Sequence, residues 1–233
     1  MKKNGKTYFV SGIDTGTGKT AAAGAMLAWL LARGADATSM KLVQTGCEGI
    51  AEDLAVHRSM CGTGETADDA EGLTAPQVFR FPSSPSLSAR LEGREVDVER
   101  IAAAARELSA RHDILLAEGA GGMLVPLRGM TLAADFAAEQ GWPLILVTSG
   151  RLGSLNHTIL SLEAAKARGM DCAGVVFNEH PAADPLIADD TRRETVRHMR
   201  RLGFAPRIAT LPALPPDGSR PDTRQLDFSV IFG

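Results

Sequence analysis

Short runs of apolar residues recur along the chain, and the longer segments between them carry apolar residues at helical spacing. The apolar runs cover residues 7–10, 38–43, 114–117, 144–148, 174–177 and 207–211. The helical patterns cover residues 19–32, 51–60, 98–110, 132–139, 155–167 and 189–202. Strands that are apolar on both faces are typical of a sheet covered on each side by helices. The alternation therefore predicts an α/β fold, with a doubly wound, mostly parallel sheet and helices on both faces.

The segment after the first run reads Gly-Ile-Asp-Thr-Gly-Thr-Gly-Lys-Thr, from Gly12 to Thr20. Its glycines let successive backbone N–H groups face one anion, Lys19 can reach the outer phosphates of a nucleotide, and the Thr20 hydroxyl can bind magnesium. A Gly-rich turn can be an ordinary strand-to-helix connection. The lysine and threonine favour a loop of the P-loop NTPase type, although its first glycine lies one residue further back than in the common pattern.

Charged side chains also stand within or directly after later runs. Lys41 lies within the second run, and Glu118 directly follows the third, ahead of Gly119. In sheets of this kind ligands collect beyond the carboxyl ends of the strands. Lys41 can meet an anion there or face water on an edge strand, and Glu118 can bind magnesium, cap a helix or pair with a surface charge. Asp53, taken alone, is best interpreted as an acidic residue at a helix start.

Length and charge limit the remaining possibilities. The 233 residues can form one sizeable core, so we expect a single domain over residues 1–233. With 25 basic and 28 acidic residues, the net charge of -3 gives no global reason to bind nucleic acid or a membrane. No secretion signal or membrane-spanning stretch is recognisable, which predicts a cytoplasmic protein. The three cysteines form no CxxC pair, and His57 and His157 lack a second histidine at metal spacing, so a structural role is favoured for both.

Several motifs together resemble the dethiobiotin synthetase family. They are Gly12-x-Asp14-Thr15 with Gly18-Lys19-Thr20, Lys41-x-Val43-x-Thr45-Gly46, Glu118-Gly-Ala-Gly-Gly122, Pro82-Ser-Ser-Pro85, Leu152-Gly-Ser-Leu-Asn156-His157 and Val176-Phe-Asn178. The resemblance implies a ligase of biotin biosynthesis that depends on Mg²⁺ and ATP. Such an enzyme makes dethiobiotin from 7,8-diaminononanoate and CO₂, with ADP and phosphate as the other products.

The resemblance also implies a role for each site residue. Thr15, Lys19 and Lys41 would be catalytic, and Thr20, Asp53 and Glu118 would hold the metal. The nucleotide would contact Gly16, Thr17, Gly18, Lys19 and Thr20, with Asn178 and Pro212 around the adenine. The diamine substrate would contact Thr15, Lys41, Thr45, Gly121, Leu152, Gly153 and Asn156. Members of this family act as homodimers with the substrate site at the interface, where the 152–156 segment comes from the partner.

This chain departs from the family at three positions. Family members commonly have threonine at Ile13, proline at Leu42, and glutamate or another larger residue at Gly16. None of the three is a named catalytic side chain. The alternative function is that of a ParA- or MinD-like ATPase, a nucleotide-switched partner-binding protein. Such proteins carry a signature lysine early in the loop, where this chain has Ile13 and Asp14.

Overall fold

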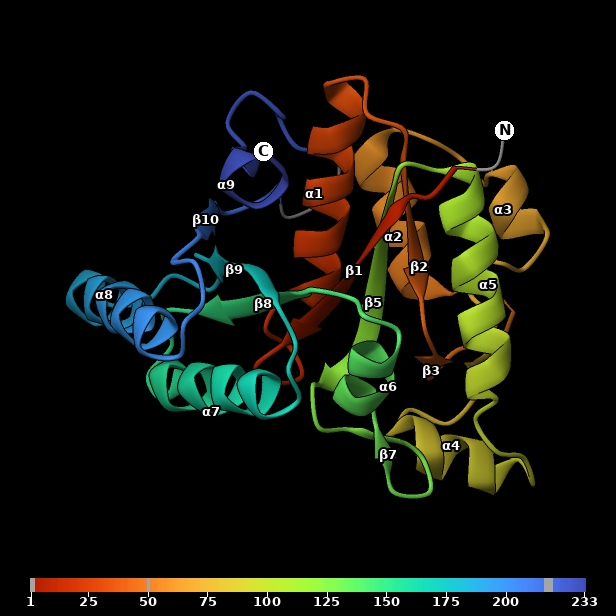
Figure 1. Cartoon of the computed structure of the whole chain (residues 1–233). Helices are drawn as coiled ribbons and strands as arrows, with labels where there is room; N and C mark the ends of the chain where they lie inside the picture. Colours follow the sequence, from red (N-terminus) through yellow and green to blue (C-terminus); the bar gives the residue numbers. More distant parts are fainter. Residues whose placement is uncertain (1–2, 50, 216–219) are drawn as a thin grey trace.

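The computed structural model describes residues 3–49, 51–215 and 220–233, and its centre is a six-stranded sheet (Figure 1). The strand order is β10-β9-β8-β1-β5-β2, and all neighbouring strands are parallel. The strands are β1 (Lys6–Gly12), β2 (Ala37–Lys41), β5 (Ile114–Gly122), β8 (Leu144–Ser149), β9 (Cys172–Asn178) and β10 (Ile208–Leu211). Each predicted apolar run forms one of these strands, so the predicted fold class is confirmed.

Helices cover both faces of the sheet, because successive strand side chains point to opposite faces. Phe9 packs into a core with α5 (Val98–Arg111), α6 (Ala133–Glu139), α7 (Ser154–Ala167) and α8 (Pro185–Arg201). Its neighbours Tyr8 and Val10 pack into a second core with α1 (Lys19–Ala32), α2 (Glu52–Cys61) and the short α9 (Ser229–Phe232). None of the helices in the described ranges combines the length and the apolarity that a membrane span requires.

The structure differs from the prediction in element length and in short elements. Two extra pairs of short strands are present, β3 (Gln44–Thr45) with β4 (Val78–Phe79) and β6 (Pro126–Arg128) with β7 (Thr131–Leu132). The short helices α3 (Ala67–Ala70) and α4 (Pro85–Leu91) were also not predicted, because elements of one or two turns are too short to show a repeating hydrophobic pattern. Helix α8 begins earlier than predicted, at Pro185, because the Asp184 side chain accepts hydrogen bonds from the backbone of its first turn.

Strand β5 continues through the glycines that the sequence placed after it. Glu118 therefore lies within the strand, where its partners are Val10 on β1 and Lys41 on β2. The ladder of β1 and β5 resumes at Gly12 and Gly122 after a shift in register. As a result, the ends of the three strands meet at the start of α1.

Helices α1 and α2 approach closely at Gly24. A Cβ atom on Gly24 would lie 2.6 Å from the sulfur of Met60 and 3.4 Å from the Cα of His57. A glycine at this point of α1 therefore lets α2 lie against it, and α2 carries Asp53 in its first turn.

Candidate active site

The predicted phosphate-binding loop connects β1 to α1, and two of its side chains bond the same backbone carbonyl. Gly16 and Gly18 have φ values of +76° and +86°, a region that favours glycine. The Thr17 hydroxyl and the Lys19 ammonium each donate a hydrogen bond of 3.0 Å to the carbonyl of Asp14. Burial, and then the charge of a second lysine, Lys41, lower the pKa of Lys19. An anion bound at this loop would favour the charged form of Lys19 and so offset both effects.

Asn178 ends β9 and supports this loop through hydrogen bonds. Its side-chain nitrogen donates to the Thr17 carbonyl at 3.0 Å, and its oxygen accepts from the backbone N–H of His180 at 3.0 Å. A Cβ atom on Gly18 would lie 2.3 Å from that nitrogen. Contact of Asn178 and the half-buried Pro212 with adenine stays a prediction, and the hydrogen bond to Thr17 places Asn178 against the loop.

Replacing Gly18 with alanine is expected to lower both thermal stability and ADP affinity, because the new methyl group would displace Asn178. The control is Gly16→Ala, since Gly16 has a similar φ but no atom within 4 Å of the place that its Cβ would take. Gly16→Ala should cost only the left-handed backbone energy, about 1–2 kcal/mol. Thermal melts and ADP titrations of both variants measure the difference, and equal losses would show that the contact with Asn178 is unimportant.

Four predicted site residues meet at the edge of the sheet. Lys41 is the last residue of the edge strand β2 and is only 4% exposed, so it does not face water. Its ammonium group lies 2.8 Å from Oε1 of Glu118 and forms a second ion pair with Asp53. The Thr20 hydroxyl lies 3.0 Å from Glu118 Oε1 and 3.1 Å from Asp53 Oδ1. Asp53 is thus both an acidic residue of the first helical turn and a member of this cluster.

The charges in the cluster stabilise one another. Burial alone lowers the pKa of Lys41, but the negative charges of Glu118 and Asp53 outweigh it and raise that pKa. Burial likewise raises the pKa of Glu118, but the Lys41 charge and His57 outweigh it and hold that pKa well below its usual range. Lys41 and Glu118 are therefore both charged at neutral pH.

The oxygen atoms of this cluster suit magnesium. Thr20, Asp53 and Glu118 supply a hydroxyl and two carboxylates, and Mg²⁺ prefers such hard oxygen donors, usually one or two carboxylates together with phosphates. Across the described residues, no group of three or more His, Cys, Asp or Glu side chains could hold a metal ion by itself. A metal at this cluster would consequently depend on additional oxygens, such as those of a nucleotide.

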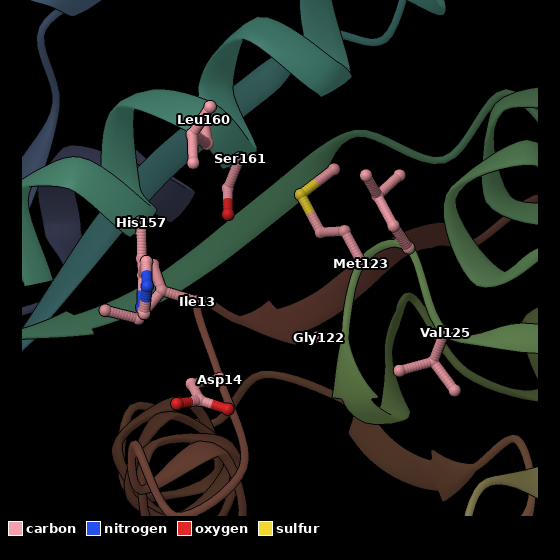
Figure 2. Close-up of a pocket in the computed structure, with 9 residues that line it drawn as sticks. Ile13, Asp14, Gly122, Met123, Val125, His157, Leu160 and Ser161 are labelled. Carbon is pink, nitrogen blue, oxygen red and sulfur yellow. The ribbon is translucent and has the colours of Figure 1, made fainter.

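A pocket of about 320 Å³ opens beside the loop (Figure 2). Its lining is mostly apolar, with Asp14, His157 and Ser161 as polar members, and the α7 side chains lie across it from Met123. Thr15, which is exposed at the tip of the loop, would be 3.7 Å from a Cβ on Gly121, next to the pocket-lining Gly122. Thr15 and Gly121 therefore lie together near this pocket, as their predicted roles require.

The other predicted substrate residues, Thr45, Leu152, Gly153 and Asn156, do not line this pocket. Thr45 follows β2 and donates its hydroxyl hydrogen to the Ser83 carbonyl at 3.0 Å. Leu152, Gly153 and Asn156 are exposed at the start of α7, where Gly153 takes a left-handed conformation. This segment begins beside the phosphate loop, because Arg151 lies 3.6 Å from the Asp14 carboxylate.

The three departures from the family pattern have clear positions. Ile13 is buried and lines the pocket, and Gly16 has open space around it. The backbone N–H of Leu42 donates to the Glu118 carbonyl at 3.0 Å, a bond that a proline could not make. In this chain the strand pairing that holds Glu118 thus extends one residue past Lys41.

His57 is a neighbour of the cluster that the sequence had assigned only a structural role. Its Nε2 lies 3.1 Å from Oε2 of Glu118, and both side chains are fully buried. The available signal is its spacing, because His57 follows Asp53 by one helical turn and shares its face of α2.

Comparison with known proteins gives relatives of high similarity. The chain matches a family model described as an AAA domain over residues 6–218. It is 43% identical over 200 residues to the ATP-dependent dethiobiotin synthetase BioD of Chlorobaculum tepidum, which covers 86% of this chain and 84% of that protein. It is 44% identical over 183 residues to the ATP-dependent dethiobiotin synthetase BioD 2 of Haemophilus influenzae, which covers 78% of this chain and 96% of that protein.

A solved structure supports the architecture. The ParA family ATPase from Chlorobium tepidum matches with a TM-score of 0.52 and 14% identity, covering 91% of this chain and 86% of that one. At such low identity the likeness shows the fold alone.

Proposed function

The chain belongs to the dethiobiotin synthetase family, and from that premise we propose that it forms dethiobiotin from 7,8-diaminononanoate, CO₂ and ATP. ADP and phosphate are the other products. The observation that carries the proposal is the buried Lys41, held between Asp53 and Glu118 beside a phosphate-binding loop with its own buried lysine. A site with two concentrated lysines suits a reaction between two anions.

The reaction joins a carbamate to a triphosphate. One amine of the substrate adds to CO₂ and loses a proton, which gives a carbamate. A carbamate oxygen then attacks the γ-phosphorus of ATP and ADP leaves. The second amine attacks the carbonyl carbon of the resulting mixed anhydride and loses a proton. A C–N bond forms, the C–O bond to phosphate breaks, and phosphate leaves as the urea ring closes.

The protein side chains can lower the barrier to these steps without forming a covalent bond to the substrate. Carbamate and γ-phosphate repel each other, and Lys19 and Lys41 bring positive charge to the place where they must meet. Thr45 already donates its hydroxyl hydrogen to Ser83, so toward the substrate its oxygen can only accept. This polarity suits an amine N–H and would help to orient the diamine.

Thr20, Asp53 and Glu118 would hold a magnesium ion. When bound there, the ion would neutralise charge on the outer phosphate oxygens of ATP. The convergence of these three side chains on one point supports the assignment.

The pocket beside the loop suits the diamine in size and polarity, since its apolar lining can take an aliphatic chain and its polar rim can take the ends. We place the working enzyme in the cytoplasm as a single-domain homodimer. The 152–156 segment, in which Leu152, Gly153 and Asn156 are exposed, would then be available to bind the substrate carboxylate of the other protomer, at the start of α7.

The proposal is tested by incubating the protein with 7,8-diaminononanoate, ¹³C-bicarbonate, ATP and Mg²⁺, and by detecting dethiobiotin by mass. We expect labelled dethiobiotin and one ADP for each product molecule, with little ADP when the diamine is omitted. The matched negative control is the Lys19→Ala variant. ATP hydrolysis without any labelled product would contradict the proposal and favour the nucleotide-switched ATPase.

A further inference from the structure

The two oxygens of Glu118 have different surroundings. Oε1 accepts from Lys41 at 2.8 Å and from Thr20 at 3.0 Å. Oε2 lies 3.1 Å from Nε2 of His57, and apart from this polar contact neither atom meets a hydrogen-bond partner among the described residues. Because Glu118 is fully buried, water cannot replace this contact. His57 is thus the group that fixes the rotation of the Glu118 carboxylate on its second side.

The hydrogen bonds behind His57 determine how it faces Glu118. Its Nδ1 lies 2.9 Å from the Ser39 hydroxyl, which also accepts from the Arg58 guanidinium at 3.1 Å. Arginine can only donate, so the Ser39 hydrogen is free to point at Nδ1. The hydrogen-bond network then assigns a proton to Nε2, where it faces the carboxylate. The opposite tautomer would direct a lone pair at Oε2.

The same network also holds Lys41. The Arg58 guanidinium pairs with both oxygens of Asp69, at 2.8 Å each. Asp69 accepts from the Thr74 hydroxyl at 2.6 Å, and the Thr74 carbonyl accepts from the backbone N–H of Lys41 at 2.7 Å. Since Lys41 bonds Glu118, the contacts form a closed ring through strand, helix and loop. A shift of His57 or Arg58 would therefore change the contacts of both Lys41 and Glu118.

From this ring we propose that His57 is a positioning residue, which holds Glu118 in the orientation that binds the metal of the nucleotide complex. The inference rests on the proposed function only in taking Glu118 as a metal ligand. Hydrogen bonds behind a metal ligand orient it, and their loss commonly weakens metal binding by about 10–100-fold. Without His57, the buried Oε2 would lose its polar contact at 3.1 Å, and the carboxylate would be free to rotate away from its present orientation.

The test compares ADP affinity with and without Mg²⁺, measured by calorimetry on the whole chain. In wild type, Mg²⁺ is expected to tighten ADP binding. The His57→Leu variant removes the imidazole at similar volume, and the factor by which Mg²⁺ tightens ADP binding should be about tenfold smaller than in wild type. Its ADP affinity in EDTA should stay unchanged, because Lys19 and the loop are intact. His57→Gln, which keeps a donor near the Nε2 position, should restore the gain to within about threefold of wild type.

The Ser39→Ala variant tests the same idea in a protein that keeps His57, in case His57→Leu does not fold. Ser39→Ala keeps His57 but removes the hydroxyl behind it, and it should reduce the magnesium-dependent gain by a smaller factor. An unchanged gain in His57→Leu or in Ser39→Ala, or a gain in His57→Gln no better than in His57→Leu, would overturn the proposal. Because these titrations need no diamine, their outcome is separate from whether wild type makes dethiobiotin.

Discussion

Replacement of Lys41 by alanine is expected to lower kcat by at least about 100-fold, with a much smaller effect on ATP affinity. The Lys41 ammonium is buried and faces the carboxylates, so it can act on charge that develops during phosphoryl transfer. Ground-state binding of ATP, by contrast, is expected to depend mainly on the loop and Lys19. Steady-state turnover and equilibrium ATP titration measure the two effects separately, and unchanged turnover would remove Lys41 from the site.

A matched variant separates the charge of Lys41 from its packing. Lys41→Met keeps a long apolar side chain, so an equal loss of turnover in both variants would attribute the effect to the ammonium group. Either change leaves the buried Glu118 without its main positive partner, which can cost about 3–5 kcal/mol of stability. Thermal melts must therefore accompany the kinetics, and both variants should be assayed below their melting temperature.

Replacement of Glu118 by glutamine is expected to raise the magnesium concentration for half-maximal activity by about 100-fold, at the upper end of what lost metal contacts cost. Glutamine keeps the shape of the side chain but not the charge, so the hydrogen bond from Lys41 can persist while the attraction for a divalent ion is lost. A magnesium titration of initial rates measures the shift.

The control for Glu118→Gln is Glu99→Gln. Glu99 is exposed on α5 and pairs with Arg128, so the same chemical change there should leave the magnesium titration unaltered. An unaltered titration in Glu118→Gln would rule out Glu118 as a metal ligand, whatever its effect on turnover.

The sheet could be predicted from the sequence because strands buried on both faces are continuous apolar runs, as in β8. The limits of β5 could not, because residues 119–122 are three glycines and one alanine, which form no apolar run, and the last of them joins the sheet by pairing with Gly12 of β1. Lys41 and Glu118 were recognisable since one is a charge inside an apolar run and the other directly follows one. In an α/β sheet, ligands bind beyond the carboxyl ends of the strands, so residues there can be singled out once the strands are recognised.

His57 shows what local patterns cannot predict. A lone histidine in a helical segment has no signature of its own, and its partners Ser39 and Glu118 come from β2 and β5. Asp53 was ambiguous for the same reason, because a helix start explains it fully until β2 brings Lys41 beside it. Such roles depend on contacts between distant segments, which only the folded arrangement supplies.

Protein engineers who seek heat-resistant enzymes often convert helical glycines to alanine, which gains about 0.5–1 kcal/mol where the site is open. Gly24 is a position in α1 where this rule should fail. A methyl group there would have to displace the buried sulfur of Met60, which belongs to the helix that presents Asp53 and His57 to the sheet. A thermostabilisation library for this chain should therefore leave Gly24 unchanged, since alanine there is expected to lower the melting temperature instead of raising it.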